Sequence, residues 1–294
     1  MRKIDSNVIM LVLLAVVGIY VVLSQIILLP ISNTGMVLTV ALLFFIIVII
    51  HGWKTLGVRE LLIFLLIAYC IPLLYEYTDG LGFGGLVQCI CSYSNLLGPK
   101  FLGKVPYVIP LVWSIFLYTT FTMTNIIFHR IRITQRWGEV GSLRWFFTIV
   151  GMGIVMGFIM ASLDLILDPV MVAMGAWSWS VQGPYYGIPL WNFEGWIEIS
   201  AVTFVCYNAY LLIRKKSQMY VQGEKRSRYT LMVVVLYLTF LVIYGIYAVM
   251  QQVTDVIPWA VMAMGFFSAI TIIQFYRSKV KGGTVVSSSD GGLV

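Results

Sequence analysis

Long apolar runs, separated by short polar stretches, dominate the hydropathy pattern of this 294-residue chain. A helix needs about 20 apolar residues, with a range of about 17–25, to cross the hydrocarbon core of a bilayer. The pattern therefore predicts an all-α, polytopic membrane protein with about eight transmembrane helices. The predicted spans are 8–29, 35–50, 60–77, 105–128, 145–167, 195–213, 230–250 and 257–276.

Two of these runs, 35–50 and 60–77, are short for a bilayer span, and one of them could form a re-entrant or tightly paired segment. The first run follows Arg2 and Lys3. It is too long for the apolar core of a secretory signal, so we interpret it as a retained helix.

Composition supports the same class. The chain is 60% hydrophobic and 11% charged, and its mean hydropathy is +0.94. A soluble domain of this length would need more charge to cover its surface, so we expect a multi-pass protein of the cell membrane. We expect one transmembrane helical domain over 1–281 and a disordered Gly/Ser-rich tail over 282–294.

The basic residues predict the orientation. If the N-terminus is cytoplasmic and eight helices alternate, all 19 Lys and Arg residues except Lys100 and Lys104 fall in cytoplasmic segments. This is the distribution of the positive-inside rule, so both termini are predicted to be cytoplasmic, with irregular loops on the outer side. The basic loops are topology signals, and no nucleic-acid partner is expected.

Acidic residues gather on the outer side instead. An ionisable group at membrane depth costs about 2.5–3.5 kcal/mol on insertion scales, so such groups are candidate functional residues. The alternative is that they are solvated at the interface and cap helix ends. The outer acids are Glu76, Asp79, Asp164, Asp168, Glu194, Glu198 and Asp255.

Three of these acids flank the most unusual loop of the chain. Asp164 and Asp168 are four residues apart, so they lie on one face at the end of the fifth predicted span. Pro169 disfavours helix at the residue before it, and the span is predicted to stop at about Asp168. Glu194 begins the next span.

The loop between them is rich in aromatic and turn-forming residues. An aromatic belt at the membrane interface is one explanation. A belt does not require an asparagine, several Gly and Pro positions and flanking acids, so we favour the lining of a pocket. The candidate substrate-binding residues are Trp177, Trp179, Tyr185, Tyr186, Asn192 and Trp196.

Three motifs carry a resemblance to a known family. They are D-L-I-L-D-P-V from Asp164, G-A-W-S-W from Gly175, and G-P-Y-Y-G-I-P-L-W-N-F-E-G-W from Gly183. L-G-P-K-F-L-G-K-V-P from Leu97, together with Trp113, also fits. The chain resembles the integral-membrane carotenoid-biosynthesis family over roughly residues 60–215. Characterised members of that family are carotenoid 1,2-hydratases, including bisanhydrobacterioruberin hydratase.

The resemblance implies a cofactor-independent hydro-lyase. Its reaction adds water across the terminal C1=C2 double bond of an acyclic carotenoid, such as bisanhydrobacterioruberin or lycopene. Protonation at C2 gives a tertiary cation at C1, which water captures. The site then needs an acid, a stabiliser for the cation and a group that orients water.

The acidic and aromatic residues can supply these three functions. A buried carboxyl group can remain protonated, because burial disfavours its charged form. One of Asp164 and Asp168 is the predicted acid, the other or Glu194 orients water, and Glu76 is a further catalytic candidate. The tryptophan and tyrosine rings would stabilise the cation.

No metal, nucleotide or flavin is required by this chemistry, and the motifs that bind them are absent from the sequence. The expected partners are a lipophilic carotenoid substrate and membrane lipid, and other carotenoid-biosynthesis enzymes are candidates. The sequence leaves open whether Cys89 or Cys91 forms a disulfide.

Two other kinds of function stay open. Asp164-x3-Asp168 has the form of one half of a diphosphate–Mg²⁺ site, as an intramembrane prenyltransferase of the lycopene elongase type would need. Such a site also needs cationic phosphate ligands, and the outer side offers only Lys100 and Lys104. A non-catalytic protein that binds or transports carotenoids would also use acids and broken helices within the membrane.

Overall fold

Eight helices make up nearly all of the regular structure in the described residues. The computed structural model describes residues 6–26, 33–78, 91–128, 143–214 and 229–282. The predicted all-α class and helix number are confirmed. The helices are α1 Ser6–Ile26, α2 Asn33–Thr55, α3 Val58–Tyr77, α4 Val108–Ile127, α5 Leu143–Ala173, α6 Leu190–Ile213, α7 Met232–Met250 and α8 Ile257–Gly282.

Seven of these helices, α2 to α8, are long and apolar enough to cross a bilayer, so the chain is a multi-pass membrane protein. The two runs that are short in the sequence form full helices, with 23 residues in α2 and 20 in α3. The predicted tail 282–294 lies outside the described residues, except for Gly282 at the end of α8.

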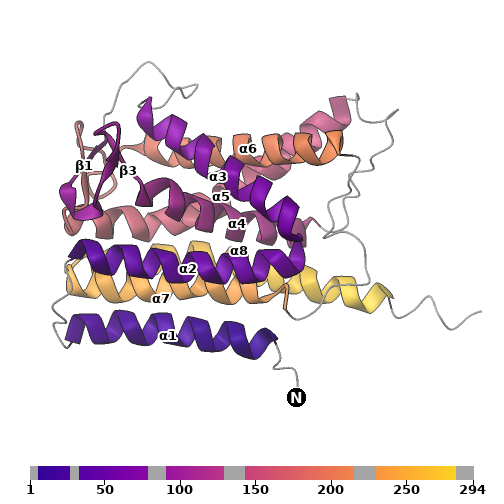
Figure 1. Cartoon of the computed structure of the whole chain (residues 1–294), viewed down its shortest axis with the longest axis horizontal. Helices are drawn as coiled ribbons and strands as arrows, with labels where there is room; N and C mark the ends of the chain where they lie inside the picture. Colours follow the sequence, from indigo (N-terminus) through magenta and orange to yellow (C-terminus); the bar gives the residue numbers. More distant parts are fainter. Residues whose placement is uncertain (1–5, 27–32, 79–90, 129–142, 215–228, 283–294) are drawn as a thin grey trace, which may run out of the picture.

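The helices run side by side along the long axis of the molecule (Figure 1). The first residues of α1 and the last residues of α8 lie at the same end. The short strands lie at the opposite end. There β1, Cys91–Tyr93, pairs antiparallel with β4, Trp177–Trp179, and β2, Lys100–Phe101, pairs with β3, Val105–Pro106.

Helix α4 forms the centre of the bundle, and almost every residue of it is buried. It carries four buried threonines, whose hydroxyls each donate to the backbone carbonyl four residues earlier. A polar group inside an apolar bundle must be hydrogen-bonded, and these bonds satisfy the hydroxyls within the helix. The threonines are Thr119, Thr120, Thr122 and Thr124.

Helix α5 does not stop at Asp168, and the prediction that it ends there is wrong. It continues through Pro169 to Ala173. A proline inside a helix has no N–H, so the carbonyl four residues earlier loses its partner. That carbonyl belongs to Leu165, and the hydroxyl of Tyr185 donates to it at 2.8 Å. The tyrosine therefore supplies the hydrogen bond that Pro169 cannot make.

Helices α5 and α6 approach each other closely because small residues face the crossing. A Cβ atom on Gly157 would lie 2.6 Å from the Cα of Ile197 and 2.8 Å from its carbonyl oxygen. A Cβ on Gly153 would lie 3.0 Å from the Cα of Ala201. A side chain at Gly157 would collide with the backbone of α6 and one at Gly153 would press against it, so the two glycines allow the middle of α5 to lie close to α6.

Candidate active site

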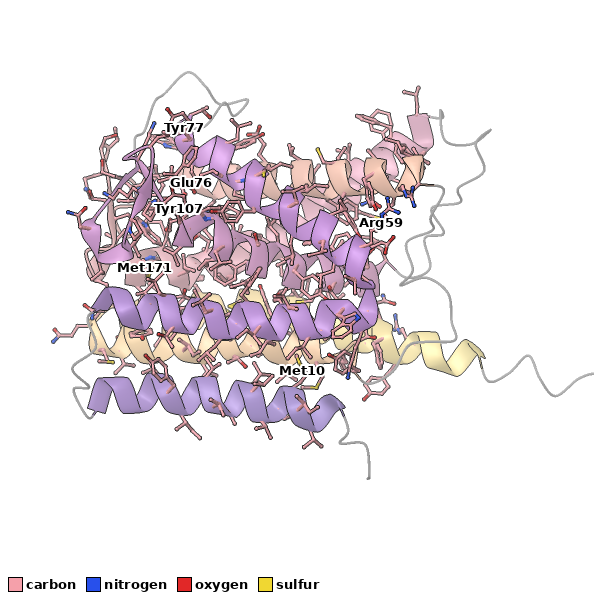
Figure 2. All side chains as sticks on the ribbon, viewed as in Figure 1. Met10, Arg59, Glu76, Tyr77, Tyr107 and Met171 are labelled. Carbon is pink, nitrogen blue, oxygen red and sulfur yellow. The ribbon has the colours of Figure 1, made fainter. Side chains whose placement is uncertain are left out.

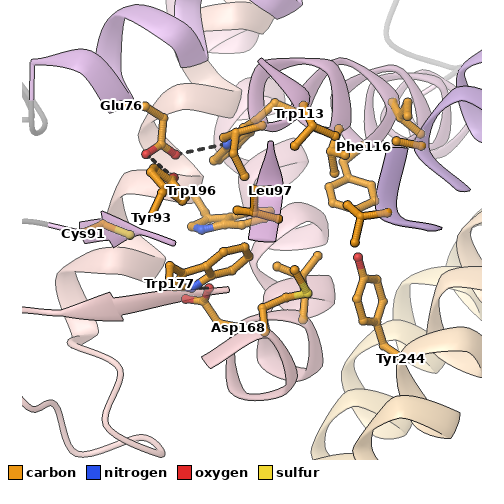
Figure 3. Close-up of a pocket in the computed structure, with 18 of the residues that line it drawn as sticks. Glu76, Cys91, Tyr93, Leu97, Trp113, Phe116, Asp168, Trp177, Trp196 and Tyr244 are labelled. Carbon is orange, nitrogen blue, oxygen red and sulfur yellow. Dashed lines mark hydrogen bonds between the residues drawn. The ribbon is translucent and has the colours of Figure 1, made fainter. Parts of the chain in front are cut away.

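A cavity of about 250 Å³ opens among the helices at the strand end of the bundle. Helices α2 to α7 and both strands of the β1–β4 pair contribute to its lining. Most of the lining is apolar, and the polar groups gather on one side, where α3, α5, α6 and the strands meet (Figure 3). The cavity therefore combines an apolar chamber with a small polar corner.

Two carboxyl groups of α5 form the first part of this corner. Asp164 is 0% exposed and Asp168 is 2% exposed. The amide nitrogen of Asn192 donates to Oδ2 of both, at 2.8 Å for Asp164 and 2.5 Å for Asp168. The indole of Trp177 donates to Oδ1 of Asp168 at 3.0 Å. One asparagine thus holds both acids close together in a buried setting.

The two acids differ in how they meet the cavity. Asp168 lines it, and both of its oxygens accept hydrogen bonds. Asp164 lies one helical turn away and is not among the lining residues. Its Oδ1 is buried and has no hydrogen-bond partner in the described part of the chain. Asp168 is therefore the member of the pair that can reach a molecule in the cavity.

Glu76, at the end of α3, forms the second part of the corner. Its Oε2 accepts a hydrogen bond of 2.6 Å from Tyr93, and its Oε1 accepts one of 3.2 Å from the indole of Trp113 (Figure 3). Burial raises the pKa of Tyr93 well above its usual range, and the nearby Glu76 carboxylate raises it further. Tyr93 therefore keeps its proton and donates a hydrogen bond to Glu76.

Aromatic rings cover the polar corner. The rings of Trp113 and Trp196 lie 4.2 Å apart between centroids with their planes 34° from parallel. Tyr93 meets Trp177 edge to face at 6.0 Å. Both Trp177 and Trp196 are buried. The carboxyl groups of Glu76 and Asp168 therefore line a chamber that also has aromatic faces, to which a cation is attracted.

The comparison with protein families decides the wider identity. A family model described as carotenoid biosynthesis protein matches residues 35–267, from α2 to α8. The chain belongs to this family. The match is longer than the stretch 60–215 that carries the motif resemblance. No curated protein and no solved structure matches the chain.

As a carotenoid biosynthesis protein, the chain acts in a pathway whose molecules are lipophilic, and it contacts membrane lipid. The apolar chamber agrees with that role. Among the described residues, no three His, Cys, Asp or Glu side chains group together as a metal ion would require. Cys91 lines the cavity, and Cys89 lies outside the described residues, so the disulfide question stays open.

Six of the predicted site residues of this carotenoid biosynthesis protein line the cavity, and Asp164 joins them through Asn192. Glu194 is exposed and Tyr186 is 40% exposed, and neither is among the lining residues. Tyr185 binds the Leu165 carbonyl. The six lining residues are Glu76, Asp168, Trp177, Trp179, Asn192 and Trp196.

Sequence reasoning missed three residues of the site. Trp113 carries part of the family resemblance, but nothing in the sequence pairs it with Glu76. Tyr93 reaches Glu76 because β1 pairs with β4 in a register that sets Tyr93 opposite Trp177. Tyr244 lies within an apolar run of α7 and lines the cavity. Only long-range packing brings these three together, so no local pattern could have indicated them.

Proposed function

We propose that the protein is a carotenoid hydratase that adds water across the terminal C1=C2 double bond of an acyclic carotenoid. The observation that carries the proposal is the position of Asp168. It is a buried carboxyl group, paired with Asp164, that faces an apolar chamber walled by tryptophans. Such a group suits an unactivated alkene, because burial favours the protonated form of a carboxyl group and a dry chamber restricts capture of the cation to a positioned water.

Asp168 is the proposed acid. Two carboxyl groups that share the amide of Asn192 cannot both carry a charge at low cost in a buried site, so the pair holds one proton. Asp168 delivers this proton to C2, since it is the member of the pair that lines the cavity. The hydrogen bond from Trp177 supports the carboxylate that remains.

The cation at C1 is stabilised by the walls of the chamber. An aromatic face contributes about 2 kcal/mol or more to a desolvated cation, and Trp113, Trp177 and Trp196 all line the cavity. Glu76 adds a negative charge that is held in place by Tyr93 and Trp113. These groups are positioned before the charge develops, which is the condition for strong electrostatic stabilisation.

The size and polarity of the chamber suit the end of an isoprenoid chain. Its apolar side is built by Ala41 and Phe44 of α2 and by Phe240 and Ile243 of α7. A volume of about 250 Å³ holds an end group, and the long polyene lies outside it against apolar helix surfaces. The substrate of this proposal is therefore recognised by its branched, apolar tip.

The test is conversion of lycopene, or of a C50 acyclic carotenoid, by the protein expressed in a host that makes the pigment. The wild type is expected to give products heavier by one water per modified end. Asp168→Asn should lower hydration by at least about 10²-fold while the pigment still binds. Asp255→Asn, at an exposed aspartate before α8, is the matched control.

Each alternative function has its own outcome in this experiment. A product with a longer carbon skeleton, formed only while Mg²⁺ is present and lost after chelation with EDTA, would identify a prenyltransferase. Bound carotenoid of unchanged mass, in wild type and Asp168→Asn alike, would identify a binding protein. Uptake of carotenoid into proteoliposomes without a change in mass would identify a transporter.

A further inference from the structure

The chamber reaches the surface of the bundle at the start of α6. Among the described residues that line it, Trp191 alone is exposed, whereas the others are buried or half-buried. Gly195 lies about one turn further along α6, on the same face, and also lines the chamber. A Cβ atom on Gly195 would meet nothing within 4 Å. The lack of a side chain at Gly195 therefore leaves open space next to Trp191.

Helix α3 forms the opposite side of this opening. Tyr75 of α3 lines the chamber, and its hydroxyl donates to Oε1 of Glu198 on α6 at 2.9 Å. Glu198 lies three residues after Gly195, so this hydrogen bond connects the two helices next to the open space. We call the opening framed by Tyr75, Trp191 and Gly195 the α3–α6 mouth.

Away from the mouth, α3 and α6 pack closely against each other (Figure 1). The rings of Phe64 and Tyr207 meet edge to face at 5.0 Å between centroids. The hydroxyl of Tyr207 donates to the backbone carbonyl of Glu60 at 3.2 Å. The contact thus changes along α3 from packed rings to the hydrogen bond between Tyr75 and Glu198. The mouth lies at the strand end of the α3–α6 contact.

The mouth lies within the part of the molecule that is suited to a membrane. Both α3 and α6 are long and apolar enough to cross a bilayer. Tyr75 lies near the end of α3 and Trp191 near the start of α6, so the mouth is close to one end of both helices. Glu198 lies about two turns, or about 10 Å, further into α6 than Trp191. A carboxyl group at membrane depth is costly and indicates a functional region.

We propose that the α3–α6 mouth is the lateral entrance for the carotenoid, and that the polyene lies across Gly195 while the end group occupies the chamber. The inference rests on the proposed function for the reacting end and adds the path of the rest of the substrate. An acyclic carotenoid is far longer than a chamber of about 250 Å³ can hold, so its chain has to leave through an opening. The rings of Tyr75 and Trp191 offer apolar faces to this chain.

The test fills the mouth with a side chain. Gly195→Leu can be accommodated, because a Cβ atom there meets no neighbour. We expect the purified variant to bind lycopene at least about 10-fold more weakly than the wild type, because the polyene and the new side chain would compete for one space. A short acyclic isoprenoid with the same terminal double bond should keep its wild-type affinity, since the chamber alone encloses it. The ligand retained by immobilised protein at equilibrium, identified by mass, measures both.

Gly265→Leu, on α8, is the matched control. A Cβ atom on Gly265 also meets nothing within 4 Å, and Gly265 does not line the chamber. This variant should bind both ligands as the wild type does. A second measurement uses the wild type itself. An acyclic isoprenoid with a photoreactive diazirine in the chain beyond its end group should label Tyr75 or Trp191.

Wild-type affinity for lycopene in a folded Gly195→Leu protein would overturn the proposal. An equal loss of lycopene and the short isoprenoid would also overturn it, because the substitution would then act on the chamber itself. If Gly195→Leu does not fold, the labelling of the wild type decides, and a label found only on other helices would overturn the entrance. A wild type that is labelled at the mouth but adds no water would refute the hydratase proposal and support the entrance.

Discussion

Three acidic side chains from one stretch of sequence reach three different environments. Asp168 is buried and lines the cavity with donors on both oxygens, whereas Asp164 is buried outside the lining, and its Oδ1 has no hydrogen-bond partner in the described part of the chain. Glu194 is exposed, although it lies only two residues after Asn192, which holds the other two. The helix face on which an acid lies, and the donors that meet it there, therefore decide its chemical character.

Tyr93 allows a test of the polar corner through pH. Burial, and then the Glu76 carboxylate, raise the pKa of Tyr93 above its ordinary value of about 10. Above pH 10 the unfolded chain loses this proton while the folded protein keeps it. Tyr93 therefore stabilises the fold fully below pH 10, and its contribution is lost as the pH rises toward the raised pKa.

The free energy of unfolding in detergent should consequently fall less steeply above pH 10 in Tyr93→Phe than in the wild type. Chemical denaturation at several alkaline pH values measures this slope. Tyr276→Phe, at an exposed position on α8, should keep the wild-type slope. Equal slopes in Tyr93→Phe and the wild type would show that Tyr93 is not held as a donor in the folded protein.

Helix α5 is the element on which the site depends most. It carries both aspartates, and its crossing with α6 places Asn192 beside them. The crossing is close because Gly157 has no side chain. A Cβ atom there would collide with the backbone of Ile197. The geometry of the carboxyl pair is therefore set by a contact about two to three helical turns away from it along α5.

Gly157→Ala should push α5 away from α6 and weaken the hydrogen bonds that Asn192 donates to Asp164 and Asp168. Overpacking of this kind costs about 1–3 kcal/mol, so we expect lower thermal stability and a loss of hydration. Gly151→Ala is the matched control, because a Cβ there meets nothing within 4 Å. Thermal unfolding and product analysis of the two variants measure the difference. Equal behaviour of both would contradict the close crossing.

One hydrogen bond near the end of α5 comes from a tyrosine hydroxyl. Tyr185→Phe should leave the Leu165 carbonyl without a donor, at a cost of about 1–3 kcal/mol in the free energy of unfolding. Tyr186→Phe, at the exposed neighbour, should cost little. Denaturant unfolding in detergent compares the two. If Tyr185→Phe were as stable as Tyr186→Phe, another group would be satisfying the carbonyl.

The hydropathy pattern predicts helices well when their ends coincide with changes in polarity. The predicted ends at Tyr77 and Ile213 agree with α3 and α6. It fails at Pro169, because the hydrogen bond that lets α5 continue comes from Tyr185 in the following loop. The pair of aspartates follows from spacing, whereas the contact of Tyr93 with Glu76 follows from strand pairing, which a local pattern does not encode.

Charged side chains of the described residues lie at both ends of the bundle. Arg59 lies at one end of α3 and Glu76 at the other, next to the strands (Figure 2). The ends of α1 and α8 that carry the termini lie away from the strands. By the positive-inside rule, the basic end is predicted to face the cytoplasm, and the cavity then lies near the outer face. A lipophilic substrate would reach it from the bilayer, with its tip in the chamber.

The source of the product oxygen is the most direct test of this account. The purified protein is incubated with an acyclic carotenoid in water labelled with oxygen-18, and the products are analysed by mass spectrometry. The account predicts one labelled tertiary hydroxyl at each hydrated end, formed by the wild type and not by Asp168→Asn. A product whose new oxygen is unlabelled, or a bound carotenoid that a folded wild-type protein leaves unchanged, would contradict it.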